Sequence, residues 1–363
     1  MTTPKPQPGL MSITPYKGGE SELEGLAEIR KLSANESPLG PSPRAVAAMR
    51  EMAATAHRYP DGGATRLRQM LGKRFGLPAD RLICGNGSDE LIGLITSCYA
   101  GEGDEVLYSR HGFLMYPIAA MANGATPVAA PETDYHADVD ALLAAVTPRT
   151  RVLFLANPNN PTGTYLSRDE VARLRAELRD DIVLVIDAAY AEYVGRNDYD
   201  SGASLVAEHD NVIMTRTFSK IFGLGGLRVG WAYGPPGIID VLHRARGPFN
   251  TNLMAQAAAI AALEDTTHLD AARAHNDRWL PWMLEQCADL GLDCPPSIGN
   301  FVLARFPGGP EQANAADTFL RNRGIIVRQM GGYGLPEALR VTIGTEADNR
   351  AVVETLKQFL AET

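Results

Sequence analysis

Short apolar runs alternate with helical patterns over residues 105–235, and this alternation restricts the fold more than any other feature of the chain. The runs that we expect to be strands are 105–109, 126–130, 151–156, 182–187, 211–216 and 228–233. One intervening helix begins at Ser167, with Glu170 three residues later as in a capping box. Strands that alternate with helices are typical of a mostly parallel sheet covered by helices on both faces. The sequence therefore predicts an α/β fold.

The segments on either side of this region follow other patterns. Residues 1–42 are rich in proline and glycine and predict an extended arm. Helical patterns cover 43–56, 66–75 and most of 236–290. After them we expect a strand at 300–306, a helix at 310–323, strands at 324–328 and 338–343, and a last helix opened by Thr345 with Asp348. We therefore expect a large domain over 43–265 and a smaller α+β domain over 266–363, to which part of 1–42 belongs.

Charge and residue usage exclude several classes of partner. The chain has 363 residues and a formal net charge of −9, which disfavours nucleic acid and polybasic membrane binding. No apolar run approaches the ~20 residues that cross a bilayer, and the N-terminus has no apolar signal-peptide core. The four cysteines and seven histidines lack ligand spacing. We expect a cytoplasmic protein with reduced thiols and no metal site.

The segment TRTFSKIFGLGGLR at 215–228 carries the strongest chemical signal. Its lysine, Lys220, is flanked by hydroxyl residues and glycines, and a partly desolvated lysine forms Schiff bases with aldehydes. Thr217, Ser219 and Arg228 are donor types that bind phosphate, with arginine acting as a bidentate fork. Together they indicate pyridoxal phosphate (PLP). The alternative is a solvated surface loop, which fits a lone Ser-Lys pair better than the whole set.

An aspartate at the end of an apolar strand supports the same cofactor. Asp187 follows the run IVLVI, at the end of a parallel strand where α/β sheets bind ligands. A carboxylate there can keep a pyridinium nitrogen protonated and so make the ring an electron sink. Tyr190 could donate a hydrogen bond to the phenolic oxygen of the ring. Taken alone, Asp187 could equally cap the next helix.

Three weaker segments add possible cofactor contacts. Asn160 in NPNNPTG would present its amide from a rigid loop, although a plain turn has the same composition. Ser88 and Asp89 in GNGSDE precede a helix, where backbone N–H groups bind phosphate. Phe113 could stack on a cofactor ring, but aromatic residues more often pack in a core.

In their order and spacing these segments resemble the fold-type I PLP-dependent aminotransferases, and within them the histidinol-phosphate aminotransferases. The resemblance covers nearly the whole chain and includes LSANESPLGPSP at 32–43, RYPDG at 58–62 and LRVTIGT at 339–345. It implies a large PLP-binding domain and a smaller one. It also implies amino transfer between L-histidinol phosphate and 2-oxoglutarate in histidine biosynthesis.

The resemblance assigns roles to individual residues. Lys220 would form the Schiff base, Asp187 would pair with the pyridine nitrogen, and these two act with Tyr190 in catalysis. The residues expected to bind the cofactor are Ser88, Asp89, Phe113, Asn160, Asp187, Tyr190, Thr217, Ser219, Lys220 and Arg228. Tyr59 would reach the phosphate of the neighbouring subunit, which implies a homodimer with shared active sites. Arg340 would bind the substrate carboxylate, with Tyr16, Asn35 and Arg328 as further substrate-side residues.

Three departures from the family pattern lie outside the expected PLP core, and two of them, in the arm and in the segment near Phe113, fall where we expect the substrate pocket. Ala188 stands where the family usually has glutamate, His111 and Gly112 replace a Pro-Thr type pair, and the arm reads PYKGG at 15–19. Two other activities therefore stay open, an aromatic amino acid aminotransferase and a PLP-dependent phospho-amino-acid decarboxylase. A transcription regulator with a PLP domain would need a basic DNA-binding extension, which we do not find in the sequence.

Overall fold

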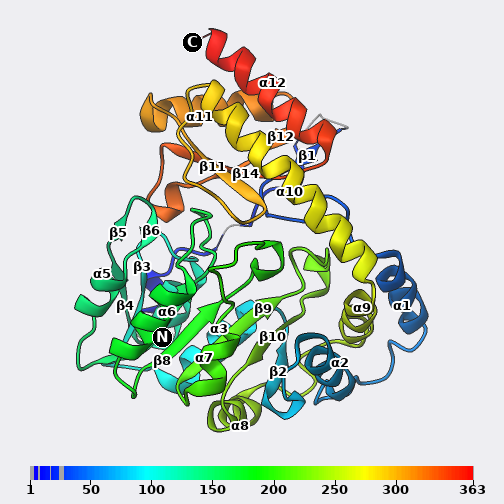
Figure 1. The fold of residues 1–363 in the computed structure, drawn as a ribbon, viewed down its shortest axis with the longest axis vertical. Helices are drawn as coiled ribbons and strands as arrows, with labels where there is room; N and C mark the ends of the chain where they lie inside the picture. Colours follow the sequence, from blue (N-terminus) through cyan, green and yellow to red (C-terminus); the bar gives the residue numbers. More distant parts are fainter. Residues whose placement is uncertain (1–3, 7–8, 17, 24–27, 363) are drawn as a thin grey trace.

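A seven-stranded sheet forms the centre of the larger body of the molecule (Figure 1). The computed structural model describes residues 4–6, 9–16, 18–23 and 28–362. The strands lie in the order β2-β10-β9-β8-β7-β3-β4. Their bounds are β2 Leu82–Gly85, β3 Glu105–Ser109, β4 Thr126–Ala130, β7 Thr150–Ala156, β8 Val183–Asp187, β9 Val212–Thr217 and β10 Gly230–Tyr233. Only β10 runs antiparallel to its neighbours, so the expected mostly parallel α/β sheet is confirmed.

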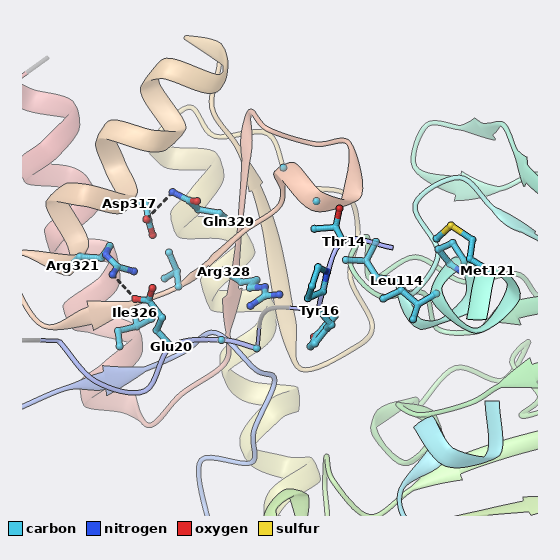
Figure 2. A pocket seen from close by; sticks show the side chains of 18 of the residues that line it. Thr14, Tyr16, Glu20, Leu114, Met121, Asp317, Arg321, Ile326, Arg328 and Gln329 are labelled. Carbon is cyan, nitrogen blue, oxygen red and sulfur yellow. Dashed lines mark hydrogen bonds and ion pairs between the residues drawn. The ribbon is translucent and has the colours of Figure 1, made fainter. Parts of the chain in front are cut away.

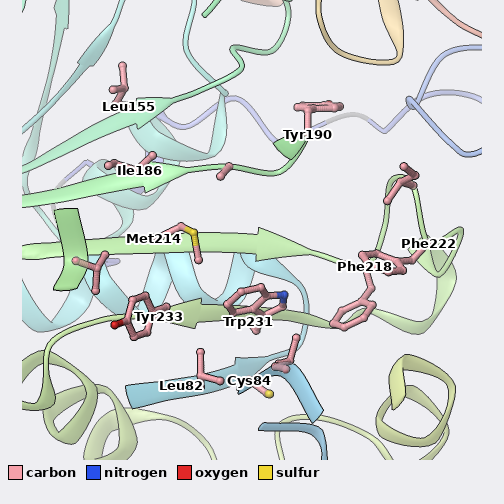
Figure 3. Close-up of a cluster of buried hydrophobic side chains, with 14 of the residues drawn as sticks. Leu82, Cys84, Leu155, Ile186, Tyr190, Met214, Phe218, Phe222, Trp231 and Tyr233 are labelled. Atoms are coloured by element: carbon pink, nitrogen blue, oxygen red, sulfur yellow. The ribbon is translucent and has the colours of Figure 1, made fainter. Parts of the chain in front are cut away.

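Both faces of this sheet are buried because successive apolar residues point to opposite sides. In β8, Leu184 and Ile186 belong to one buried cluster, whereas Val183 and Val185 belong to the other. The first cluster includes residues of the helices α1 Pro43–Ala53, α2 Thr65–Phe75, α5 Val139–Ala144, α6 Arg168–Glu177, α7 Ala203–Glu208 and α9 Leu253–Glu264, and of the first turns of a further helix described below. The helices of the second cluster are α3 Ser88–Tyr99, α4 Met115–Ala122 and α8 Pro236–Ala245. Figure 3 shows side chains of the first cluster, among them Trp231 and Met214 from neighbouring strands.

A second apolar core lies in the smaller body, drawn above the sheet in Figure 1. Its elements are β11 Phe301–Arg305, β13 Arg328–Gln329 and β14 Ala338–Thr342 in one sheet, a two-stranded pair of β1 Arg30–Lys31 and β12 Ile325–Ile326, and the helices α11 Gly309–Arg321 and α12 Glu346–Glu362. The helix α10 Thr266–Asp289 connects the two bodies. Its first turns bury Leu269 in the large core, and from Trp279 onward it packs in the small one. The boundary at residue 265 stays a prediction.

The remaining elements are short. They are η1 Leu10–Ser12, η2 Ala79–Arg81, η3 Ala191–Tyr193, η4 Gly225–Leu227, η5 Gly331–Tyr333, and the hairpin of β5 Glu132–Thr133 with β6 His136–Ala137. Within the described ranges, no helix is both long enough and apolar enough to cross a membrane.

Local sequence patterns missed some boundaries because tertiary contacts decide them. The sequence patterns did not predict β2, which ends where the glycine-rich segment GNGSDE begins, yet pairing with β10 fixes its four residues as a strand. The expected strand at 228–233 begins only at Gly230, because Arg228 has a φ of 56°. The expected strand at 324–328 is divided: β12 pairs with β1, and β13 pairs with β14. The capping boxes at Ser167 and at Thr345 are both present.

Candidate active site

Polar residues gather at the carboxyl ends of the central parallel strands. β8 ends at Asp187, and the loop after its neighbour β7 carries Asn160. On the other side, β9 leads into the loop with Lys220. Ala156, Asp187 and Thr215 are paired across the three strands, so the strand ends lie level with one another. This edge is where open α/β sheets bind ligands.

A cavity of about 170 Å³ lies at this edge. It brings together every residue that the sequence predicted for the site except Tyr59. The predicted residues that line it are Tyr16, Asn35, Ser88, Asp89, Phe113, Asn160, Asp187, Tyr190, Thr217, Ser219, Lys220, Arg228, Arg328 and Arg340. They come from both bodies of the molecule, so the cavity lies between the sheet and the smaller body.

The carboxylate of Asp187 lies on the floor of the cavity and is 5% exposed. The Tyr116 hydroxyl donates to its Oδ2 at 2.8 Å, and the Thr215 hydroxyl donates to its Oδ1 at 3.2 Å. Burial raises the pKa of Asp187 to about 6, although the two hydrogen bonds act in the opposite direction. Asp187 is therefore mostly ionised at pH 7, although burial makes its ionised form less favourable than in water.

The ammonium of Lys220 points toward the N-terminal arm. Its Nζ donates to the Ala34 carbonyl at 3.1 Å and lies 5.7 Å from the centre of the Tyr190 ring. The loop that follows Lys220 passes close to Gly40, and this approach requires glycine at position 223. The φ of Gly223 is +67°, and a Cβ there would lie 2.3 Å from the Gly40 carbonyl oxygen. Burial, followed by the positive charge of Arg340, lowers the pKa of Lys220 to about 8.

Several residues that line the cavity carry the donor types that bind anions. Ser88 begins the helix α3, whose N-terminal N–H groups carry partial positive charge. The Arg228 guanidinium crosses this helix start, donating to Asp89 Oδ2 at 2.8 Å and to the Gly225 carbonyl at 3.1 Å. Gly87, at φ +85°, leaves room for it, since a Cβ there would lie 2.6 Å from Arg228 Nη2.

Two hydroxyl groups complete this set of donors. The Thr217 hydroxyl donates to Ser219 Oγ at 3.0 Å and accepts from the Ser219 backbone N–H at 3.1 Å. Both side chains line the same cavity as the start of α3. Hydroxyls, helix amides and a guanidinium are the donors that proteins use for phosphate.

The smaller body contributes a buried arginine with a free donor. Arg340 is 6% exposed; its Nη1 donates to Asn160 Oδ1, and its Nη2 donates to the Ser33 carbonyl at 2.8 Å. Among the residues that the structure describes, its Nε has no hydrogen-bond partner. Beside it, Asn35 donates to the Tyr190 hydroxyl at 2.8 Å, which leaves the hydroxyl hydrogen of Tyr190 to donate elsewhere.

Comparison with known proteins places the chain in a family. Residues 27–356 match the sequence model described as Aminotransferase class I and II. The chain belongs to the class I and II aminotransferase family. This aminotransferase is 61% identical over 361 residues, 99% of each chain, to the histidinol-phosphate aminotransferase of Paramagnetospirillum magneticum. It is 55% identical to that of Rhodospirillum centenum, again over 99% of each chain.

A solved structure is similar along most of the aminotransferase. It is the histidinol-phosphate aminotransferase of Sinorhizobium meliloti in complex with pyridoxal-5'-phosphate. The TM-score is 0.87 at 30% sequence identity, and the match covers 91% of this chain and 90% of that chain.

The sequence did not single out all residues at the site of this aminotransferase. Tyr116 and Thr215 bind Asp187, and the Ala34 carbonyl binds Lys220. Tyr116 and Thr215 do lie in segments that the sequence marked, but only the folded chain shows where their hydroxyls point. The other lining residues that were not predicted are Gly19, Ser33, Ala156, Pro158 and Ala189.

Tyr59 lies away from the cavity of its own chain. It is 81% exposed and stacks on Phe249, with the ring centres 4.6 Å apart. The departures Ala188 and His111 also lie outside the cavity lining. Ala188 is fully buried in the large core, and His111 Nδ1 lies 2.7 Å from Glu132 Oε2.

A second cavity of about 560 Å³ adjoins the first (Figure 2). It lies between the N-terminal arm, α4 and the smaller body, and it shares Tyr16, Gly19 and Arg328 with the first cavity. The Arg328 guanidinium lies 5.6 Å from the centre of the Tyr16 ring, so these two side chains stand where the cavities meet.

The lowered pKa of Lys220 predicts an unusual reactivity in this aminotransferase. In apoprotein treated with trace acetic anhydride, we expect labelling of Lys220 to rise with pH through a midpoint of about 8. An unperturbed lysine would show a midpoint near ~10.4, because only the free amine is nucleophilic. Peptide mass spectrometry at each pH measures the labelled fraction.

A matched pair of variants tests the cause of this shift. Arg340→Gln removes a neighbouring positive charge and should move the Lys220 midpoint upward, whereas Arg350→Gln on the outer helix α12 should leave it in place. A wild-type midpoint near 10 would show that Lys220 is an ordinary solvated lysine.

Proposed function

We propose that the protein is a PLP-dependent aminotransferase that moves an amino group between L-histidinol phosphate and 2-oxoglutarate, in histidine biosynthesis. The products would be imidazole acetol phosphate and L-glutamate. One observation carries the proposal: a single cavity joins Lys220, Asp187, an anion-binding helix start and Arg340. Full-length similarity to relatives named histidinol-phosphate aminotransferase supports the choice of substrate.

The donor set of the cavity fits PLP. The start of α3 with Thr217, Ser219 and Arg228 suits the phosphate, and the Asp187 carboxylate suits a protonated ring nitrogen. Asn160 and Tyr190 would bind the ring oxygen, and Phe113 would lie against the ring face.

The residues of the chain would divide the chemistry between them. When bound, PLP supplies an aldehyde that condenses with amines and a ring that withdraws electrons. Asp187 holds the proton on the ring nitrogen, which keeps the ring electron-poor. Lys220 would hold the aldehyde carbon of the cofactor, and its Nζ would carry the proton released from the substrate α-carbon. A pKa of about 8 makes this amine a competent base near neutral pH.

Arg340 must serve two unlike substrates. Glutamate presents an α-carboxylate, whereas histidinol phosphate has a phosphate ester arm at that position. A guanidinium suits both because its planar fork matches carboxylate and phosphate oxygens alike. Arg328, which is paired with Arg340 across the neighbouring strands β13 and β14, would bind mainly the ester phosphate.

We also propose a cytoplasmic homodimer with shared active sites. The side chain of Tyr59 is exposed and stacks on Phe249, away from the cavity of its own subunit. This position would let it reach the cavity of a second subunit. In the dimer, Tyr59 would contact the cofactor phosphate of the neighbouring subunit.

Single-turnover spectra of the PLP form test the substrates. We expect fast conversion with histidinol phosphate and glutamate and slower conversion with phenylalanine. Arg340→Lys should slow both fast reactions by ~10–1000-fold, since one bidentate charged contact is degraded. Arg328→Ala should slow the histidinol phosphate reaction selectively.

Each outcome of this experiment has a clear meaning. Faster turnover of phenylalanine than of histidinol phosphate would favour the aromatic aminotransferase, and release of CO₂ would favour the decarboxylase. Unchanged glutamate chemistry in Arg340→Lys would remove Arg340 from the site. The exposed Arg350→Gln variant serves as the control, since a surface ion pair contributes only ~0–1 kcal/mol.

Mixing two variants tests the shared site. We expect Tyr59→Phe to lower PLP affinity and Lys220→Ala to abolish turnover. In a mixed dimer, one site carries both lesions and the other carries neither. At limiting PLP, activity should therefore exceed that of either parent after subunit exchange. No gain despite confirmed exchange would place Tyr59 in the site of its own subunit.

A further inference from the structure

Tyr116 connects two parts of the site that the sequence treated separately. It lies in the first turn of α4 and is fully buried. Its hydroxyl donates to Asp187 Oδ2 at 2.8 Å. Its ring stacks on Phe154 at 4.6 Å with an interplanar angle of 4°, and meets the Phe113 ring edge-on at 5.9 Å. One side chain therefore contacts both the carboxylate and the aromatic ring expected to face the cofactor.

Thr215 acts on the other oxygen of the same carboxylate. It lies on β9 beside Asp187 in the sheet register, is fully buried, and donates to Asp187 Oδ1 at 3.2 Å. The two hydroxyls approach from different layers, one from the helix α4 and one from the sheet. Rotation of the carboxylate in either direction would break one of these bonds.

We propose that Tyr116 and Thr215 are positioning residues that keep Asp187 ionised and aimed at the ring nitrogen of the cofactor. The inference rests on the proposed function for the identity of the cofactor. It goes beyond that function because neither residue is expected to touch cofactor or substrate.

The direction of these hydrogen bonds supports this role. Burial and the adjacent Asp187 raise the pKa of Tyr116 well above its usual range, so its hydroxyl stays protonated and donates. Hydroxyl donors stabilise a carboxylate more than a carboxylic acid, and so oppose the effect of burial on Asp187. Of the other charged groups near Asp187, Asp89 on α3 raises its pKa and Lys220 lowers it. Tyr333 and Tyr190 also raise the pKa of Tyr116.

Loss of either hydroxyl has a predictable effect on the shared proton. Without one donor, the Asp187 carboxylate becomes a stronger base. The proton between it and the ring nitrogen then shifts toward Asp187. If Tyr116 and Thr215 only filled space, replacing them with phenylalanine and valine would not move this proton, because the new side chains have nearly the same shape.

The test uses protein loaded with PLP that is ¹⁵N-labelled at the ring nitrogen. The nitrogen chemical shift reports directly whether the ring carries the proton, independently of turnover. Tyr116→Phe and Thr215→Val each remove one hydroxyl, whereas Thr215→Ser keeps a hydroxyl at position 215. Tyr108→Phe is the matched control, since Tyr108 is a half-buried neighbour whose ring lies 6.4 Å from that of Tyr116.

We expect wild-type protein, Thr215→Ser and Tyr108→Phe to give a signal typical of a protonated ring. Tyr116→Phe and Thr215→Val should move the signal toward that of an unprotonated ring, and the double variant should move it further. Wild-type signals in both Tyr116→Phe and Thr215→Val would overturn the inference.

A second readout needs no cofactor. In apoprotein with ¹³C-labelled aspartate carboxyls, the Asp187 signal is identified by its loss in Asp187→Asn. Its titration midpoint of about 6 should rise by about one pH unit or more in Tyr116→Phe. An unchanged midpoint would contradict the inference. If wild-type protein bound no PLP, the proposed function would fail, and this titration would decide the inference alone.

Discussion

The parallel alignment of β7, β8 and β9 is the constraint on which the site depends. Their register pairs Ala156 with Asp187 and Asp187 with Thr215, so three strands end at one level. Apolar side chains pack on both faces of the sheet. A shift of β8 by one residue in the strand register would therefore turn Asp187 out of the cavity and move each apolar side chain of β8 to the opposite face. The packing of the core thus fixes the positions of Asp187, Lys220 and Asn160 together.

The same burial sets the electrostatics of the site. It raises the pKa of Asp187 from 3.8 to about 6 and lowers that of Lys220 from 10.5 to about 8. For Asp187 this net shift corresponds to a cost of ~3 kcal/mol at neutral pH, and the cost would be larger without the Tyr116 and Thr215 hydroxyls, which lower the pKa. A cationic ring nitrogen would offset more. The free protein therefore holds Asp187 and Lys220 in states that a suitable ligand stabilises.

The sequence predicted those parts that local pattern decides. The strands β3 and β4 have the expected bounds, since alternating apolar runs between turn residues specify them. Motif resemblance identified most of the residues that line the cavity, because most of these motifs lie directly after a strand or before a helix. The pairing of β1 with β12 and the contact of Tyr116 with Asp187 join residues far apart in the chain. Such contacts depend on tertiary packing, and no pattern within one segment contains them.

We propose that Lys220 and Asp187 bind one PLP molecule at the carboxyl edge of the sheet. The most direct measurement is to add PLP, reduce the complex with borohydride and locate the modified residue by peptide mass spectrometry. Reduction makes the link between PLP and its lysine permanent. We expect one modified lysine per chain, at Lys220. Modification of a different lysine, or none on protein that has bound PLP, would contradict it.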